Sequence, residues 1–218
     1  SWAPEMCIRD SYPTTQIDNG KTGKCVKLET RLTGDLGNMV GMPIAAGNLF
    51  IGSFDMLNAI TNPLSATRFG TPFYNKPLRL TGYYKYKAGE QFYENGEYTS
   101  RKDIFNIYAI FYDGVKYDSA GKGTDVTLDG NLPNQNYEHS SMVALALVSN
   151  PQETEGDEWK FFDIPFDYQR YGKKIDEARL AKGEYKIGII FASSKDGATF
   201  EGAPGSTLLI DEVELIYE

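Results

Sequence analysis

The feature that most constrains the fold of this chain is a series of short segments in which apolar and polar residues alternate, separated by turns rich in Gly, Pro and Asn. The clearest segment is 77–87, which is followed by the turn residue Gly89. Alternation with a period of two is typical of a β-strand, and many strands at short intervals favour a sandwich or barrel over a βαβ sheet. The other predicted strands are 24–30, 45–54, 104–112, 126–128, 142–148, 159–164, 185–192 and 207–217.

This pattern predicts an all-β domain built as a two-sheet antiparallel sandwich, with at most one short helix. The helix is expected near 175–180, with Gly183 as its C-terminal stop. Residues 142–148 are almost continuously apolar, which is typical of a strand covered on both faces. Residues 1–23 predict an irregular lead-in that packs on a single sandwich domain over 24–218, a length sufficient for one such domain.

The charge of the chain disfavours two classes of partner. The net charge is −8 and no cluster of Lys and Arg occurs, whereas nucleic-acid binding needs a basic face that neutralises phosphates. The same reasoning disfavours an anionic membrane surface. No apolar stretch approaches the ~20 residues that span a bilayer, and no signal peptide is evident at Ser1. We therefore expect a mature fragment of a longer protein.

Residues that bind metals or act as nucleophiles are few. Cys7 and Cys25 are compatible with a disulfide or with two buried thiols. No Cys/His zinc spacing occurs, and His139 is expected to be solvated in a polar loop. A cofactor is not indicated. The last predicted strand allows a structural calcium ion, although charge that protects an edge strand is the more ordinary explanation. Its acidic residues are Asp211, Glu212 and Glu214, with Glu29 as a contributor across the sheet.

Six segments resemble one known family. They are 46–54 (AGNLFIGSF), 70–73 (GTPF), 77–86 (PLRLTGYYKY), 103–109 (DIFNIYA), 191–197 (FASSKDG) and 205–215 (GSTLLIDEVEL). In this order they resemble the putative carbohydrate metabolism domain (PCMD) family of Bacteroidetes surface proteins. The resemblance implies a jelly-roll fold similar to carbohydrate-binding modules. It also implies an exported lipoprotein or secreted chain, periplasmic or at the outer-membrane surface.

Alternation also assigns side chains to the two faces of a strand. In 77–87 the leucines mark the core face, and in 104–112 the phenylalanines do so. The opposite faces would form one aromatic and polar surface, provided that the two strands lie in one sheet. Aromatic rings against sugar C–H faces, with amides and charged groups on the hydroxyls, commonly hold carbohydrate. The candidate ligand-binding residues are Tyr83, Lys85, Asn106, Tyr108 and Tyr112.

Two structural roles compete with ligand binding at these tyrosines. They could form cross-strand pairs that stabilise an ordinary solvated sheet, or they could pack beneath a long loop. Trp159, which alternates with Phe161, is expected in the core or at a corner of the sandwich.

Catalysis has weaker support than binding. A glycoside hydrolase needs two carboxylates, ~5–5.5 Å apart for retaining or ~6.5–9.5 Å apart for inverting chemistry. Asp103, Asp196 and Glu201 lie near predicted strand ends, but nothing in their spacing selects a pair, and His139 belongs to no evident triad. We therefore expect a domain that binds a poly- or oligosaccharide without converting it. A glycoside hydrolase and a surface module that binds protein are the alternatives.

Overall fold

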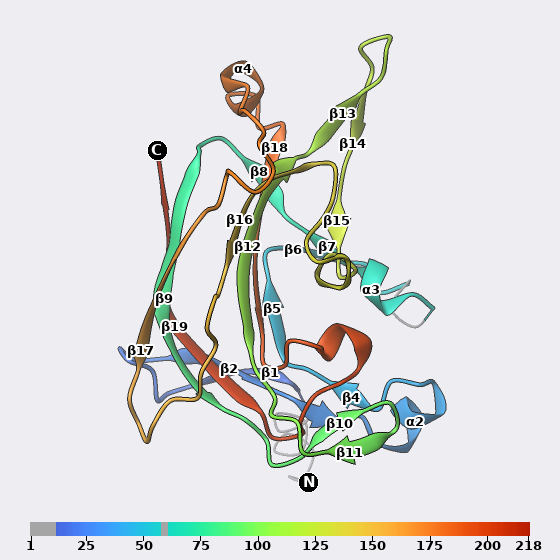
Figure 1. Ribbon diagram of the computed structural model, residues 1–218, viewed down its shortest axis with the longest axis vertical. Helices are drawn as coiled ribbons and strands as arrows, with labels where there is room; N and C mark the ends of the chain where they lie inside the picture. Colours follow the sequence, from blue (N-terminus) through green and yellow to red (C-terminus); the bar gives the residue numbers. More distant parts are fainter. Residues whose placement is uncertain (1–11, 58–60) are drawn as a thin grey trace, which may run out of the picture.

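The computed structural model describes residues 12–57 and 61–218. Two antiparallel sheets face each other and form the body of the fold (Figure 1). The strand order of the first sheet is β1–β2–β19–β9–β17. Its strands are β1 (Thr14–Ile17), β2 (Cys25–Glu29), β19 (Thr207–Tyr217), β9 (Pro77–Lys87) and β17 (Lys160–Pro165).

The second sheet has the order β16–β12–β18–β5, and β8 shares the edge of β18 with β5. β5 pairs with the end of β18 and β8 with its beginning, so two short strands cover one long edge. The strands are β16 (Met142–Leu147), β12 (Asn106–Asp113), β18 (Tyr185–Ala192), β5 (Asn48–Phe50) and β8 (Thr71–Phe73).

Smaller elements decorate the two sheets. One is a three-stranded sheet of β15 (Leu128–Asp129), β7 (Thr67–Phe69) and β6 (Gly52–Phe54). The others are two-stranded sheets: β10 (Phe92–Glu94) with β11 (Glu97–Thr99), β13 (Val115–Tyr117) with β14 (Gly123–Asp125), and β3 (Arg31–Leu32) with β4 (Ile44–Ala45). The helices are α2 (Gly34–Met39), α3 (Pro63–Ala66) and α4 (Glu177–Leu180), with 3₁₀ turns at Pro133–Gln135 and Gly197–Thr199. In the described part of the chain, no helix is long and apolar enough to cross a membrane.

The predicted all-β sandwich is confirmed, with differences in detail. The predicted helix near 175–180 is α4, and Asp176 caps it by accepting the N–H groups of Ala178 and Arg179. The prediction of at most one helix is wrong, because α2 and α3 form where Gly and Pro indicated loops. The irregular lead-in is also wrong for Thr14–Ile17, because β1 pairs with β2 along the sheet edge.

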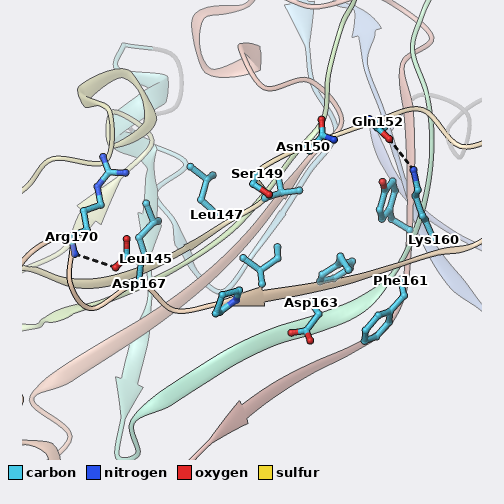
Figure 2. Close-up of a pocket in the computed structure, with 15 residues that line it drawn as sticks. Leu145, Leu147, Ser149, Asn150, Gln152, Lys160, Phe161, Asp163, Asp167 and Arg170 are labelled. Carbon is cyan, nitrogen blue, oxygen red and sulfur yellow. Dashed lines mark hydrogen bonds between the residues drawn. The ribbon is translucent and has the colours of Figure 1, made fainter.

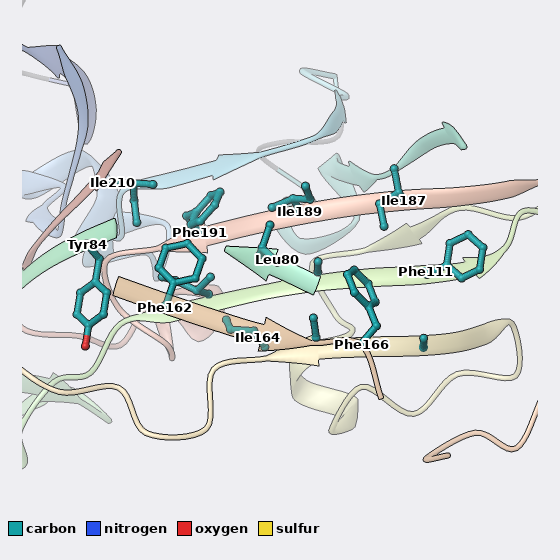
Figure 3. Close-up of a cluster of buried hydrophobic side chains, with 14 of the residues drawn as sticks. Leu80, Tyr84, Phe111, Phe162, Ile164, Phe166, Ile187, Ile189, Phe191 and Ile210 are labelled. Carbon is teal, nitrogen blue, oxygen red and sulfur yellow. The ribbon is translucent and has the colours of Figure 1, made fainter. Parts of the chain in front are cut away.

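The main core fills the space between the sheets. Leu80 of β9, Phe111 of β12 and Ile189 of β18 belong to one cluster of buried side chains (Figure 3). Gly82 makes room for the Phe162 ring on the neighbouring strand, since a Cβ at this position would lie 2.6 Å from that ring. Burial of each such side chain contributes roughly 1.5–3 kcal/mol. Other members of the cluster are Leu28, Tyr84, Tyr86, Phe105, Ile107, Ile164, Phe166, Ile187, Phe191, Leu208 and Ile210.

The opposite face of the second sheet is buried as well. The face is covered by β6, β7 and β15 and by the residues that follow β15 up to residue 137 (Figure 1). Their side chains pack on the sheet and form a second cluster. The Tyr112 hydroxyl donates to the Phe69 carbonyl at 2.6 Å, which ties β12 to β7. β12 and β16 are therefore strands covered on both faces, as predicted for 142–148. The cluster contains Phe69, Tyr108, Ile110, Tyr112, Leu128, Leu132, Tyr137, Met142, Leu145 and Ile190.

A buried carboxylate joins the two sheets at one end. Asp103 Oδ2 accepts hydrogen bonds from the Ser194 hydroxyl at 2.5 Å, the Ser206 hydroxyl at 2.7 Å and the Ala203 N–H at 2.8 Å, and Oδ1 accepts the Ile104 N–H at 2.9 Å. Ser194 follows β18 of the second sheet, and Ser206 precedes β19 of the first. Because a buried polar group must be paired, this carboxylate fixes several chain segments at once.

Asp103→Ala should therefore lower the free energy of unfolding by at least about 3 kcal/mol, because it leaves buried donors without an acceptor. Urea unfolding followed by circular dichroism measures this change. The control is Asp157→Ala, an exposed carboxylate whose loss should change the free energy by no more than about 0.5 kcal/mol. Equal stability of the two variants would contradict the structural role of Asp103.

Candidate functional site

The five residues predicted to bind ligand lie in two different sheets. Tyr83 and Lys85 belong to β9, whose neighbours are β19 and β17. Asn106, Tyr108 and Tyr112 belong to β12, whose neighbours are β16 and β18. The premise of a single sheet is therefore wrong, and the five residues form no common surface. Alternation assigns faces within one strand, but it carries no information about which strands pair.

The three β12 residues match the alternative in which tyrosines pack beneath a loop. Asn106, Tyr108 and Tyr112 are buried in or beside the second cluster. The Asn106 amide donates to the Tyr137 hydroxyl at 2.9 Å, and the Tyr108 ring lies edge-on to the Tyr137 ring, with centroids 5.1 Å apart. These residues are therefore not part of an open platform.

Tyr83 and Lys85 do point outward, on the solvent face of the first sheet. The Tyr83 ring contacts Phe161 on the neighbouring strand, with centroids 5.1 Å apart and planes at 55°. The Lys21 ammonium lies 4.0 Å from the Tyr83 centroid, and the Lys85 ammonium lies 5.1 Å from that of Trp159. Trp159 is half-buried just before β17. The outer face therefore carries a short aromatic strip rather than the predicted two-strand surface.

A cleft of about 510 Å³ runs along the seam where the edges of the two sheets meet (Figure 2). β16 is the edge strand of the second sheet and β17 is that of the first. Reciprocal backbone hydrogen bonds between Leu145 and Asp167 connect the two edges at one point. Buried side chains of the main core, Tyr84, Phe162 and Ile164, form its floor.

Polar side chains gather at the two ends of the cleft. Figure 2 shows Asn150, Gln152 and Lys160 at one end, where the Lys160 ammonium donates to the Gln152 amide oxygen at 3.2 Å. The side chains of Ser149 and Asn150 have no hydrogen-bond partner among the described residues. These hydroxyl and amide groups are therefore available to a ligand.

The charged groups of the cleft are largely engaged by the protein. Asp163 pairs with Arg79 at 2.6 Å on the outer side of β17. Asp167 Oδ1 accepts the backbone N–H groups of Gln169 at 2.9 Å and Arg170 at 3.2 Å. The Arg170 guanidinium donates to Glu138 at 2.9 Å and to the Asn136 carbonyl at 2.7 Å. The carboxylates and the guanidinium are thus held in fixed positions by partners of their own.

Burial also acts on the floor of the cleft, where it raises the pKa of Tyr84. The phenol therefore stays neutral at physiological pH and keeps its hydroxyl proton.

Phe161 connects the cleft with the aromatic strip. Its side chain is 55% exposed, which is high for a phenylalanine, and it both lines the cleft and contacts Tyr83. In Figure 2 it points to the outer side of β17, next to Asp163. A ligand that leaves the cleft across β17 would meet this ring first.

The carboxylates considered for hydrolysis lie elsewhere. Burial raises the pKa of the Asp103 carboxyl, but both of its oxygens accept hydrogen bonds inside the protein, and the group is inaccessible. Asp196 forms an ion pair with Arg101, and Glu201 accepts the Thr199 hydroxyl at 3.4 Å. None of these three carboxylates lines the cleft. The carboxylates that do are Asp163 and Asp167.

The residues considered for calcium have protein partners. Asp211 Oδ2 accepts the backbone N–H groups of Lys21 at 2.7 Å and Thr22 at 3.2 Å, and Glu212 pairs with Lys21 at 3.2 Å. Glu29 pairs with Lys27 and Arg31. Across 12–57 and 61–218, no three Asp, Glu, His or Cys side chains come together as metal ligands do.

Two further predicted features concern single side chains. His139 is exposed in its loop, as predicted. Cys25 is buried on β2, where burial raises the pKa of its thiol. Cys7 lies outside the described residues, so the choice between a disulfide and two thiols stays a prediction.

Sequence reasoning missed most of the residues that build the cleft. The alternation of 159–164 did indicate that Phe161 and Asp163 share a face. Ser149, Asn150 and Gln152 follow β16 in a polar connection that carries no motif. Their proximity to β17 arises from the way two sheet edges meet, which no local pattern encodes.

Two solved structures are closely similar to the chain. One, from Bacteroides vulgatus, is described as a putative glycoside hydrolase. It is 54% identical in sequence to this chain and superposes on it with a TM-score of 0.87. The match covers 96% of this chain and 79% of that one. The other, from Bacteroides thetaiotaomicron, has the same description; it shares 51% identity and a TM-score of 0.86, and the match covers 96% of this chain and 58% of that one. The chain therefore spans little more than half the length of the second protein.

A search of curated proteins finds no significant match to the chain. The profile described as "Putative carbohydrate metabolism domain" matches residues 4–216, which is nearly the whole chain. This match agrees with the six segments that carried the resemblance in the sequence. The chain belongs to the putative carbohydrate metabolism domain family.

Proposed function

We propose that this domain binds a poly- or oligosaccharide along the cleft between β16 and β17 and retains it without cleaving it. The observation that carries the proposal is the exposed Phe161 ring beside a cleft whose Ser149 and Asn150 side chains lack protein partners. A sugar presents C–H groups on its faces and hydroxyls around its edge. An aromatic ring suits the first, and amide and hydroxyl groups suit the second.

The size of the cleft fits this class of ligand. Its volume of about 510 Å³ lies within the roughly 300–1,000 Å³ that is usual for ligand sites. The floor is apolar and the ends are polar, so a sugar chain can place its faces on the floor and its hydroxyls at the ends. The aromatic strip of Tyr83 and Phe161 extends the same chemistry over β17.

Family membership supports a carbohydrate ligand, since the family is described by carbohydrate metabolism. The two similar Bacteroides proteins are described as putative glycoside hydrolases, and one of them has much additional chain. The described activity of the Bacteroides thetaiotaomicron protein can therefore reside outside the part that corresponds to this domain. We also propose an extracytoplasmic location, periplasmic or at the outer-membrane surface, within a longer exported chain.

Hydrolysis by this domain is the second candidate function, and the observation that favours it is the presence of Asp163 and Asp167 on the cleft. A hydrolase needs one carboxylic acid that gives a proton and one carboxylate that attacks or activates water. Asp163 is instead paired with Arg79, and Asp167 is held by two backbone N–H groups. Both carboxylates therefore already have partners within the protein, whereas a catalytic pair must face the scissile bond from two sides.

Phe161→Ala should raise the Kd for a retained polysaccharide about tenfold, equivalent to about 1.4 kcal/mol, through loss of the stacking ring. Affinity electrophoresis with each polysaccharide of a broad panel measures the change. The matched control is Phe54→Ala on β6, because Phe54 is 52% exposed and lies outside the cleft. Equal weakening by both variants, or none by Phe161→Ala, would place the ligand elsewhere.

Retention without release is expected when the purified domain is incubated with the same panel and reducing ends are measured in the same wells. Release of sugar that disappears in Asp163→Asn and Asp167→Asn would overturn the binding proposal in favour of hydrolysis. If the domain neither retains nor releases any glycan of the panel, the proposal fails and a protein-binding surface module takes its place.

A further inference from the structure

A second hollow, of about 170 Å³, lies on the face of β12 and β18 that points away from the main core. Its walls are aromatic: Phe50 and Phe69 meet edge-on with centroids 5.5 Å apart, and Phe69 and Tyr108 do so at 6.4 Å. Phe200, from the loop after β18, lines it as well. This hollow is separate from the cleft, with which it shares no lining residue.

Two buried polar side chains that line the hollow have unused hydrogen-bonding capacity. Tyr108 is 2% exposed, and its hydroxyl has no hydrogen-bond partner among the described residues. Asn106 is 3% exposed; its NH₂ group donates to Tyr137, and its carbonyl oxygen accepts no bond from any described residue. Neither atom is among the fully buried side-chain atoms that lack a partner in the described part of the chain, which are Arg31 Nε and the Tyr86 hydroxyl. The Tyr108 hydroxyl and the Asn106 carbonyl oxygen are therefore open to the hollow, where a ligand can supply the bonds that the protein does not.

The backbone around the hollow is held in an unfavourable conformation at two bulky residues. Phe200 has a φ of 61° and Tyr137 has a φ of 60°, both in the left-handed region that non-glycine residues seldom adopt. Phe200 lines the hollow, and Tyr137 supports its wall through the Asn106 hydrogen bond and the contact with the Tyr108 ring. Backbone of this kind clusters at ligand sites, where the fold maintains it.

Size and charge define the ligand. The hollow has about a third of the volume of the cleft, 170 Å³ against 510 Å³, and a ligand as small as one sugar ring suits this size. Lys195, at an exposed position, is the only charged side chain among the described residues that line it. The interior therefore offers aromatic faces, a hydroxyl and an amide, and it contains no charge that would require a charged ligand.

We propose that this hollow binds a single neutral sugar residue, whose ring lies among Phe50, Phe69 and Phe200 and whose hydroxyls bond to Tyr108 and Asn106. The proposal shares its ligand class with the proposed function but uses none of the cleft residues. A glycan end that enters the hollow while the chain runs elsewhere would be held at a second point.

The test is calorimetric titration of the domain and its variants with D-glucose, D-galactose, D-mannose, L-fucose and N-acetyl-D-glucosamine. At least one of them should bind, and Tyr108→Phe should raise its Kd about tenfold. Because the Tyr108 hydroxyl has no partner in the protein, this variant should unfold at the same urea concentration or a higher one. The matched control is Tyr168→Phe outside the hollow, which loses the bond from its hydroxyl to the Pro77 carbonyl. It should be less stable and should bind the sugar unchanged.

A second variant and the cleft variant separate the outcomes. Ala198→Phe, at the half-buried edge of the hollow, should block the sugar by filling its space. Phe161→Ala should leave binding of the monosaccharide unchanged. If none of the sugars binds, the proposal of a second site is wrong. That result does not bear on the cleft, because polysaccharide retention through Phe161 is measured separately by affinity electrophoresis. Monosaccharide binding that is lost in Phe161→Ala but kept in Tyr108→Phe assigns the sugar to the cleft and also overturns the second site.

Discussion

The arrangement of the two sheets depends on one buried carboxylate. Asp103 collects hydrogen bonds from the start of β12, the end of β18 and the turn before β19, and so links both sheets at one end of the sandwich. Thr30, just after β2, joins the same network through hydroxyl contacts with Ser193 and Ser194 at 2.7 and 2.5 Å. Removal of a carboxylate with this many partners would leave donors in an apolar environment, where water cannot replace the lost acceptor.

This constraint also positions the two candidate sites. Ser194 and Lys195 follow β18 and line the small hollow, so the network that holds Ser194 sets one wall of it. The cleft lies along a different boundary, where the sheets are connected by the bonds between Leu145 and Asp167. One end of the sandwich is therefore fixed by a polar network, whereas the seam at β16 and β17 is bridged at a single point and leaves space between its edges.

Much of the fold could be predicted from the sequence, because strands and faces are local properties. The strands 77–87, 185–192 and 207–217 end at the predicted residues, and Leu80 and Phe111 lie in the core as alternation required. Strand pairing could not be predicted in this way, because it depends on contacts between distant segments. The predicted ligand surface failed at this step, since it joined strands from different sheets.

The burial of Asn106, Tyr108 and Tyr112 did leave a signal in the sequence. Residues 104–112 contain almost no charged or strongly polar side chains, and the argument that placed 142–148 between two layers applies to them equally. Tyrosine obscured the signal because its ring suits a core while its hydroxyl suits a surface. The residues of the cleft left no comparable signal, since Asn150 and Gln152 belong to an irregular connection.

The walls of the cleft have a property that side chains alone do not give. Both β16 and β17 are edge strands, so each turns a row of backbone N–H and C=O groups toward the seam. Outside the contact of Leu145 with Asp167, no strand of the described chain covers these rows. Amino-acid substitution changes side chains but leaves these groups in place. Part of the hydrogen-bonding capacity of the seam therefore does not depend on which side chains stand along it, and chains of this fold that differ in half of their residues can share this backbone template.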